Sequence, residues 1–152
     1  MKLYSILVLR KDAEKATVIA DQFDLSSFGY FQRSSVQEFM VFTATTVAER
    51  TEAGKRQSIE SENNVLHIYS HPRGIATILI SDKEYPSRVA FSLLNKVADE
   101  FIVKFPTEKW NTPKLEYPEL AEYLRKYQDP KQADTIMKVQ NELDETTAIL
   151  VR

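Results

Sequence analysis

The sequence predicts a single α+β domain in which helices cover an antiparallel sheet. Its 152 residues correspond to about one domain, and 43% of them are hydrophobic, enough to form a core. Its predicted elements follow the order strand, strand, helix, three strands, two helices. This order lacks the regular alternation that builds a parallel sheet. The domain is expected to occupy residues 1–128.

Two hairpins and an edge strand are expected to form the sheet. Leu3 to Leu9 is almost continuously apolar, which is typical of a strand buried on both faces, and Ala16 to Ala20 returns after a polar turn. Val65 to Tyr69 and Ile75 to Ile80 form a second pair around a Pro-Arg-Gly turn. The short polar stretch from Gln57 to Glu60 is expected at the edge of the sheet.

Three helices are expected to complete the domain. Ser35 and Glu38 have the spacing of a capping box, which predicts a first helix of about 16 residues that starts at Ser35 and ends near Gly54. Apolar residues at helical spacing predict a second helix from Ser87 to Phe105, stopped by Pro106. The apolar positions of a shorter third helix are Leu120, Tyr123, Leu124 and Tyr127.

The first helix is predicted to have a second apolar strip besides the one that faces the sheet. The residues expected to face the sheet are Val36, Met40, Thr43 and Val47. Phe42 lies roughly 120° from that direction, with Phe39 about halfway between. Either Phe42 packs on a neighbouring loop or edge strand, or it lines a groove between this helix and the edge strand near Ile59.

Composition and charge exclude several functions. Twenty Lys and Arg against 22 Asp and Glu leave a net charge of −2, so no global positive field is available to bind nucleic acid or an acidic membrane. The absence of cysteine excludes disulfides, thiolate metal sites and a cysteine nucleophile. A local membrane-binding face requires folding to gather the basic residues Arg10, Lys11, Lys15, Arg50, Lys55 and Arg56.

No catalytic pair or metal site emerges from the sequence. His67 and His71 are four residues apart, but a metal-binding pair at that spacing needs a helix, and these two lie on a predicted strand and in a turn. The carboxylates that flank turns, where charge is usually solvated, are Glu60, Glu62, Asp82 and Glu84. We therefore expect no enzymatic activity, no cofactor and no metal, and a small metalloenzyme is the least supported alternative.

The residues after Tyr127 follow a different pattern. In residues 129–152, apolar or small residues alternate in steps of three and four, which is typical of a coiled-coil seam. The seam positions are Ile136, Val139, Leu143, Thr146 and Leu150. An isolated helix of this length is marginal in water, so the segment needs a partner. The alternative is a final helix of the folded domain, although the seam is narrower than a core-facing stripe usually is.

Four blocks of the sequence resemble the longin-domain R-SNAREs, specifically the lipid-anchored type that lacks a transmembrane helix. The blocks are FGYFQRSSVQEFM (Phe28 to Met40), EYPSRVAF (Glu84 to Phe91), KYQDPKQAD (Lys126 to Asp134) and KVQNELDET (Lys138 to Thr146). They keep the family's order and cover essentially the whole chain. The resemblance implies a profilin-like longin domain, with a five-stranded antiparallel sheet between one helix and two, followed by the N-terminal part of a SNARE motif.

The function implied by this resemblance is membrane fusion in the secretory and vacuolar pathways, including transport between endoplasmic reticulum and Golgi and fusion at the vacuole. Three Q-SNARE segments would join the SNARE motif in a four-helix bundle, and no nucleic acid is involved. The family's central arginine and its prenylated and palmitoylated cysteines would lie beyond Arg152, which is off the seam. The chain is therefore expected to be truncated within the SNARE motif.

The resemblance also assigns a role to the groove of Phe39, Phe42 and Ile59. The family's SNARE segment docks there when it is not engaged with partners, and a lipid tail is a second possible occupant. The expected location is cytoplasmic and peripheral, on Golgi, endosomal or vacuolar and ER-derived membranes. A subunit of a vesicle coat or tethering complex, in which the longin fold forms a permanent interface, is the alternative.

Overall fold

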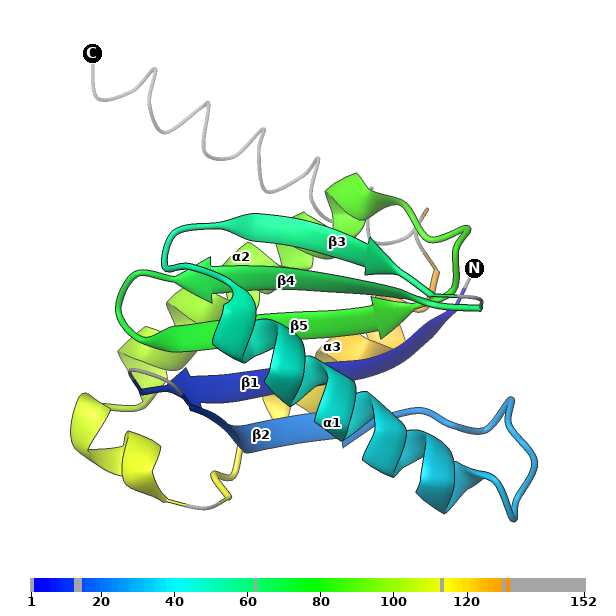
Figure 1. Cartoon of the computed structure of the whole chain (residues 1–152), viewed down its shortest axis with the longest axis horizontal. Helices are drawn as coiled ribbons and strands as arrows, with labels where there is room; N and C mark the ends of the chain where they lie inside the picture. Colours follow the sequence, from blue (N-terminus) through cyan, green and yellow to red (C-terminus); the bar gives the residue numbers. More distant parts are fainter. Residues whose placement is uncertain (1, 13–14, 62, 113, 130, 132–152) are drawn as a thin grey trace.

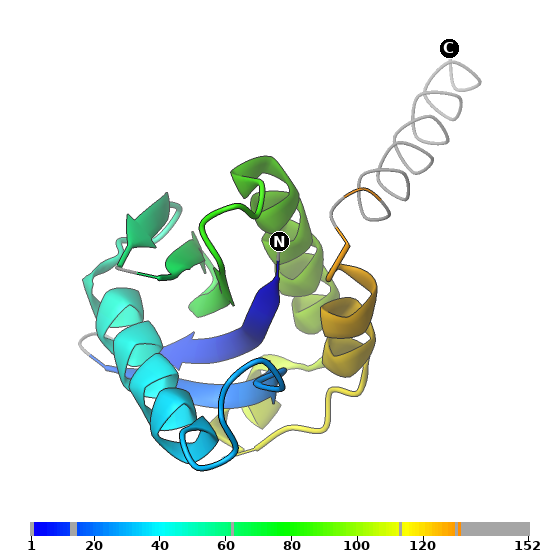
Figure 2. The same cartoon turned by 90° about the vertical axis from the view of Figure 1, so that its right-hand side faces the viewer.

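The computed structural model describes residues 2–12, 15–61, 63–112, 114–129 and 131. Five strands form one antiparallel sheet in the order β2-β1-β5-β4-β3. The strands are β1 (Leu3–Lys11), β2 (Ala16–Phe23), β3 (Arg56–Glu60), β4 (Val65–His71) and β5 (Ile75–Ser81). Helix α1 (Arg33–Arg50) covers one face, and α2 (Ser87–Lys104) and α3 (Glu119–Lys126) cover the other (Figures 1 and 2). The predicted α+β architecture, with a five-stranded antiparallel sheet between one helix and two, is confirmed.

The central strands contribute to both hydrophobic layers because successive side chains of a strand point to opposite faces. On β1, Ile6 and Val8 pack toward α2 and α3, whereas Leu7 and Leu9 pack toward α1. All four side chains are fully buried, as predicted for a strand covered on both faces. In contrast, all five residues of β3 are exposed, which confirms the predicted polar edge strand.

Helix α1 begins two residues before the predicted start, and the predicted capping box does not form. Its N-cap residue, Gln32, makes no side-chain cap hydrogen bond. Instead, the Arg33 Nε donates to the carbonyls of Leu25 (3.1 Å) and Phe28 (3.2 Å) and so ties the first turn to the preceding loop. Tertiary contacts therefore determine where this helix starts, and Ser35 lies within its first turn.

The C-terminus of α1 also differs from the prediction. The helix ends at Arg50, because Thr51 is already extended. Gly54 does adopt a left-handed conformation, with φ of +83°, but in the turn that follows the helix. Its N–H donates to the carbonyl of Ser70 (2.7 Å), so this glycine links the turn to β4 and does not cap the helix.

The connection between α2 and α3 contains structure that we did not predict. A short 3-10 helix, η1 (Thr107–Asn111), buries Trp110, and the following segment buries Tyr117. The Leu115 N–H donates to the Ile19 carbonyl (2.8 Å), so this segment runs beside β2. Single aromatic anchors without an apolar repeat give no periodic signal in a sequence, which is why this region was missed.

Most of the predicted coiled-coil segment falls outside the described residues. The seam positions Ile136, Val139, Leu143, Thr146 and Leu150 all belong to the part of the chain that the structure does not describe. The predicted boundary between the folded domain (residues 1–128) and the coiled-coil segment (residues 129–152) therefore stays a prediction.

Phe101 is the residue of α2 whose removal should destabilise the domain most clearly. Its ring is fully buried and lies 4.9 Å from the ring of Phe105 and 5.9 Å from those of Trp110 and Tyr117, centre to centre. We expect Phe101→Ala to lower the free energy of unfolding by about 3–5 kcal/mol, measured by urea denaturation. Val103→Ala on the same helix is the control, because Val103 is 87% exposed and its loss should change stability by under about 0.5 kcal/mol. Equal effects of the two substitutions would contradict this assignment of the core.

Candidate functional site

Large apolar side chains are exposed along α1 and immediately before it. Phe39 and Phe42 are 62% and 70% exposed, and Phe31 is 94% exposed. Tyr30, also exposed, makes an edge-on contact with Phe31. Single exposed apolar residues are normal on a protein surface, but aromatic residues gathered on one element are typical of an interaction site.

The amphipathic pattern of α1 explains why these rings point outward. Met40 and Val47 are buried against the sheet, and Val36 and Thr43 are half-buried, so the predicted sheet-facing direction is the observed one. Phe39 then falls on the flank of the helix toward β3. Residues three apart on a helix are surface neighbours, so Phe42 lies beside Phe39 but farther from the sheet.

A small apolar groove lies between α1 and the start of β4, beside the edge strand β3. Its volume is about 60 Å³. The residues that line it are Phe39, Met40, Thr43, Ile59, Ser61, Asn64, Leu66 and Ile80. Met40, Leu66 and Ile80 are buried and form its floor, whereas the exposed Phe39 and Ile59 form opposite rims. We call this feature the α1–β3 groove.

The structure thus brings two of the three predicted groove residues together. Phe39 and Ile59 line the α1–β3 groove, but Phe42 is not among its lining residues. Phe42 instead borders a shallower depression on the outer side of α1, together with Val41 and Thr45. Sequence periodicity placed Phe42 off the sheet-facing direction, but it could not show on which side of the helix the edge strand lies.

The chemistry of the α1–β3 groove suits an apolar side chain. None of its described lining residues is titratable, and its polar members, Ser61 and Asn64, lie in one turn in which the Ser61 N–H donates to the Asn64 carbonyl (2.8 Å). Burial of an aliphatic side chain on this floor would be favoured by roughly 1.5–3 kcal/mol. The groove is too small to enclose a helix, so an occupant would insert one side chain and lie across the rims.

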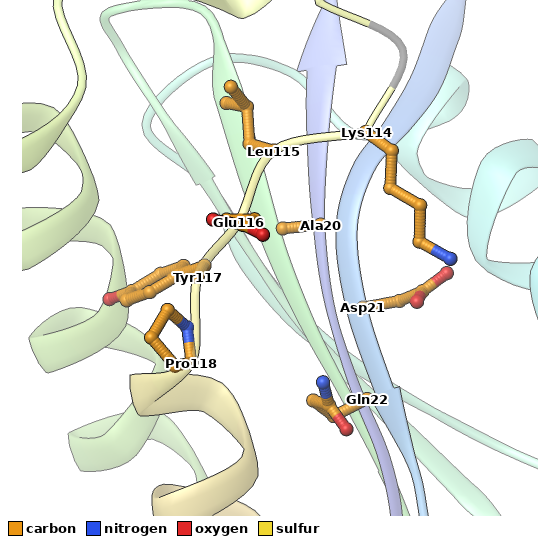
Figure 3. Close-up of a pocket in the computed structure, with 8 residues that line it drawn as sticks. All are labelled: Ala20, Asp21, Gln22, Lys114, Leu115, Glu116, Tyr117 and Pro118. Atoms are coloured by element: carbon orange, nitrogen blue, oxygen red, sulfur yellow. The ribbon is translucent and has the colours of Figure 1, made fainter.

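A second hollow has a different character. It lies between β2 and the segment before α3, with a volume of about 570 Å³ (Figure 3). Asp21 on β2 and Lys114 on the facing segment extend toward each other across it, and Glu116 and Gln22 add further polar groups. An open hollow with charges of both signs on its rim is not suited to an apolar segment.

The two histidines occupy structural positions. His67 is buried, its Nδ1 hydrogen-bonds with the Ser58 Oγ (2.8 Å), and its ring makes an edge-on contact with Phe91. Burial lowers the pKa of His67 to about 4. His71 ends β4 and accepts a hydrogen bond from the Arg73 N–H on its Nδ1 (3.0 Å).

The predicted turn carboxylates do not gather into a metal site in the described part of the chain. Asp82 accepts hydrogen bonds from the N–H groups of Glu84 (3.2 Å) and Tyr85 (3.1 Å) and so shapes the turn before α2. Glu60 is exposed on β3, and Glu62 is not among the described residues. No group of three or more His, Asp or Glu residues suited to hold a metal ion occurs among the described residues.

A five-stranded antiparallel sheet between one helix and two, with an apolar groove beside the single helix, defines the longin class of domain. A family model described as "Longin: Regulated-SNARE-like domain" matches residues 25–137. The "Synaptobrevin homolog ykt6" of Schizosaccharomyces pombe is 55% identical over 99% of this chain and 77% of its own length. The "Synaptobrevin homolog YKT6" proteins of Saccharomyces cerevisiae and Eremothecium gossypii are both 52% identical over 99% of this chain and 78% of their own length.

The chain therefore belongs to the longin-domain R-SNARE family, whose members act in intracellular membrane fusion and assemble with other SNAREs into a helical bundle. The match extends over nearly the whole chain, which favours this function over a subunit of a coat or tether. The family is in general not enzymatic. Its members work in membrane-associated trafficking, and none of the helices among the described residues is long and apolar enough to cross a bilayer.

Burial of His67 should make the domain less stable in mild acid. The unfolded chain binds a proton on this residue below about pH 6.5, whereas the folded chain does so only near its pKa of about 4. Stability should therefore fall as the pH drops from about 6.5 to 4, by up to about 3 kcal/mol. Urea denaturation at several pH values in this interval measures the slope.

His67→Gln should make this pH dependence less steep, because it removes the titrating group. This holds even where the substitution also lowers the stability at neutral pH. His71→Gln is the matched control, since His71 lies nearer the surface than His67 and burial lowers its pKa less. An equally steep loss of stability in His67→Gln and in the native protein would show that other groups cause it.

Proposed function

We propose that the α1–β3 groove shelters the protein's own SNARE segment and so controls how readily this segment enters the fusion bundle. In the sheltered state, one apolar seam residue inserts between Phe39 and Ile59 and rests on the floor formed by Met40, Leu66 and Ile80. The observation that carries the proposal is an apolar groove with exposed apolar rims, at the same end of the strands as Gln128, where the chain leaves the domain.

The residue before the proposed SNARE segment, Gln128, is fastened to the first residue of β1. The Gln128 side-chain amide pairs with both backbone groups of Leu3: it accepts from the N–H on Oε1 (2.9 Å) and donates from Nε2 to the carbonyl (2.8 Å). The Tyr85 hydroxyl donates to the Tyr127 carbonyl (2.7 Å). The side chain of Gln128 thus takes the place of a neighbouring strand where β2 has ended.

The groove is within reach of this attachment point. Leu3 pairs with Ser81 on β5, Ser81 with Val65 on β4, and Val65 with Glu60 on β3, so these residues form one row across the same end of the sheet. From Gln128 to β3 the row covers four strand spacings, about 19 Å. The extended chain from Asp129 to Ile136 spans up to about 23 Å, so the first seam residue can reach the groove.

Sheltering of this kind is reversible because the contact is small. One buried aliphatic side chain and the surrounding rims supply only a few kcal/mol. A partner shifts such an equilibrium only if it binds the released segment better than the sheltered one. A bundle that buries the whole apolar seam supplies much more favourable free energy than one residue in the groove. We infer that three Q-SNARE segments are the competing partners.

The relatives are synaptobrevin homologs, which supports a role in membrane-associated trafficking. We propose that the membranes are those of the Golgi, of endosomes or the vacuole, and of ER-derived carriers. We propose a peripheral attachment from the cytoplasmic side through prenyl and palmitoyl groups on downstream cysteines. A lipid tail is the second candidate for the groove, because its hydrocarbon suits the same apolar floor.

A charge in the groove should release the SNARE segment. We expect Phe39→Glu in the full-length protein to speed assembly with Q-SNAREs by about tenfold or more, since the lost apolar contact is worth about 1.4 kcal/mol or more. Phe42→Glu should act in the same direction but less strongly, because Phe42 lies outside the groove. Stopped-flow or fluorescence-transfer measurements of bundle formation give the rates.

Two further variants test the location of the contact. Ile59→Glu introduces a charge on the opposite rim and should reproduce the effect of Phe39→Glu. Val103→Glu is the control, because it places the same charge at an exposed apolar position on α2, on the other face of the sheet. The proposal fails if Phe39→Glu leaves the assembly rate unchanged, or if Val103→Glu increases it equally.

A further inference from the structure

Three turns meet at the end of the sheet opposite the N-terminus and the attachment point of the SNARE segment (Figure 1). The β1–β2 turn contacts the β4–β5 turn, because the Lys11 N–H donates to the Gly74 carbonyl (2.8 Å). The turn between α1 and β3 joins them through the Gly54 N–H, which donates to the Ser70 carbonyl (2.7 Å). Residues far apart in the sequence therefore share one surface, which we call the basic end.

Positive charge is concentrated at the basic end although the chain is acidic overall. Residues 11–16, 49–56 and 71–74 contain six basic residues and four acidic ones, whereas the rest of the chain contains 14 basic and 18 acidic. The basic residues are Lys11, Lys15, Arg50, Lys55, Arg56 and Arg73. Folding thus brings together five of the six basic residues named above as candidates for a membrane-binding face, and adds Arg73. Arg10 instead donates to the Trp110 carbonyl (3.3 Å) on η1.

Contacts inside the domain engage part of the negative charge at this end. The Glu49 carboxylate accepts a hydrogen bond from the Ala16 N–H (3.3 Å), and the Asp12 carboxylate lies 3.5 Å from the Arg10 guanidinium. Within the described part of the chain, the exposed side chains of Arg50 and Lys55 form no ion pair. These two cations are therefore available to an external anion.

A polar hollow places several of these cations around one space. It lies between the end of α1 and the start of β3, has a volume of about 260 Å³, and is lined by Arg50, Thr51, Glu52, Lys55, Arg56 and Gln57. From within the domain, the Lys11 ammonium donates to the Thr51 carbonyl and to the Ser70 Oγ (3.0 Å), which adds a positive charge behind the hollow. The Arg56 guanidinium already lies over the Tyr69 ring (4.2 Å) and donates to the Asn95 Oδ1 (2.9 Å), so Arg50 and Lys55 are the lining cations available to a phosphate group.

We propose that the basic end docks on an anionic phospholipid surface, with a lipid phosphate in the hollow beside Arg50 and Lys55. Lys15 and Arg73, on the two neighbouring turns, would contact adjacent headgroups. A membrane fits better than a soluble phosphate because the cations extend over three turns, a wider area than one phosphate covers. The family's work at membranes supplies this surface.

Docking through the basic end would orient the domain on the bilayer. The start of β1, where Gln128 is attached, lies at the opposite end of that strand from the basic end (Figure 1). This attachment point would face away from the lipid, and the α1–β3 groove would stay accessible to its occupant. This inference uses neither Phe39 nor Ile59 and stands whether or not the groove shelters the SNARE segment.

Vesicle co-sedimentation of the 152-residue chain tests the proposal. The chain should bind vesicles of phosphatidylcholine mixed with phosphatidylserine, and binding should weaken as salt is raised. Each basic residue near such a surface contributes about a factor of five, so the double variant Arg50→Gln, Lys55→Gln should bind roughly 25-fold more weakly. The control, Lys83→Gln with Lys114→Gln, removes the same net charge outside the basic end and should stay within about twofold of the native chain.

Several results would overturn the proposal. Equal losses in the two double variants would show that only net charge matters, and equal binding to pure phosphatidylcholine vesicles would indicate an apolar contact elsewhere. Tight binding of inorganic phosphate without binding to anionic vesicles would indicate a site for a soluble anion. Urea denaturation checks that each variant is folded. Phe39→Glu should bind vesicles like the native chain, so failure of the groove proposal would be recognised separately.

Discussion

The pairing of β1 with β5 at the centre of the sheet is the constraint on which the rest of the structure depends. Both strands are apolar on both faces, so each face must be covered by helices to keep these side chains from water. Two helices and η1 cover one face, but α1 alone covers the other. A single helix does not close a five-stranded sheet, and the α1–β3 groove remains where α1 stops short of the polar edge strand.

The direction of the strands places the α1–β3 groove and the basic end at opposite ends of the sheet. Gln128 pairs with Leu3 at the start of β1, at the same end of the sheet as the groove, while the basic turns lie at the other end of the same strand. In the two proposals, one end would exchange the SNARE segment while the other would contact a charged surface. The small size of the groove fits the proposed exchange, because a contact worth only a few kcal/mol can be released by a competing bundle.

Much of the candidate site was predictable because its residues lie on elements with strong periodic patterns. Apolar spacing on α1 separated Met40 and Val47 from Phe39 and Phe42, and the polar composition of β3 placed Ile59 at an edge. The sequence could not predict that Phe39 faces Ile59 while Phe42 borders another depression, since that depends on the side of the helix on which β3 pairs. Nor could it predict that the turns carrying Lys11, Arg50 and Arg73 share one end of the sheet, because hydrogen bonds between residues distant along the chain bring these turns together.

The sequence by itself determined the fold class, the five strands, the three main helices and the buried character of β1, because each follows from a repeat of apolar residues within one element. The tertiary structure decided the ends of α1, the position of Gly54, the anchoring roles of Trp110 and Tyr117, and the attachment of Gln128 to Leu3. These features depend on single contacts between residues distant along the chain. Local spacing carries no information about such contacts until the sheet has fixed which strands are neighbours.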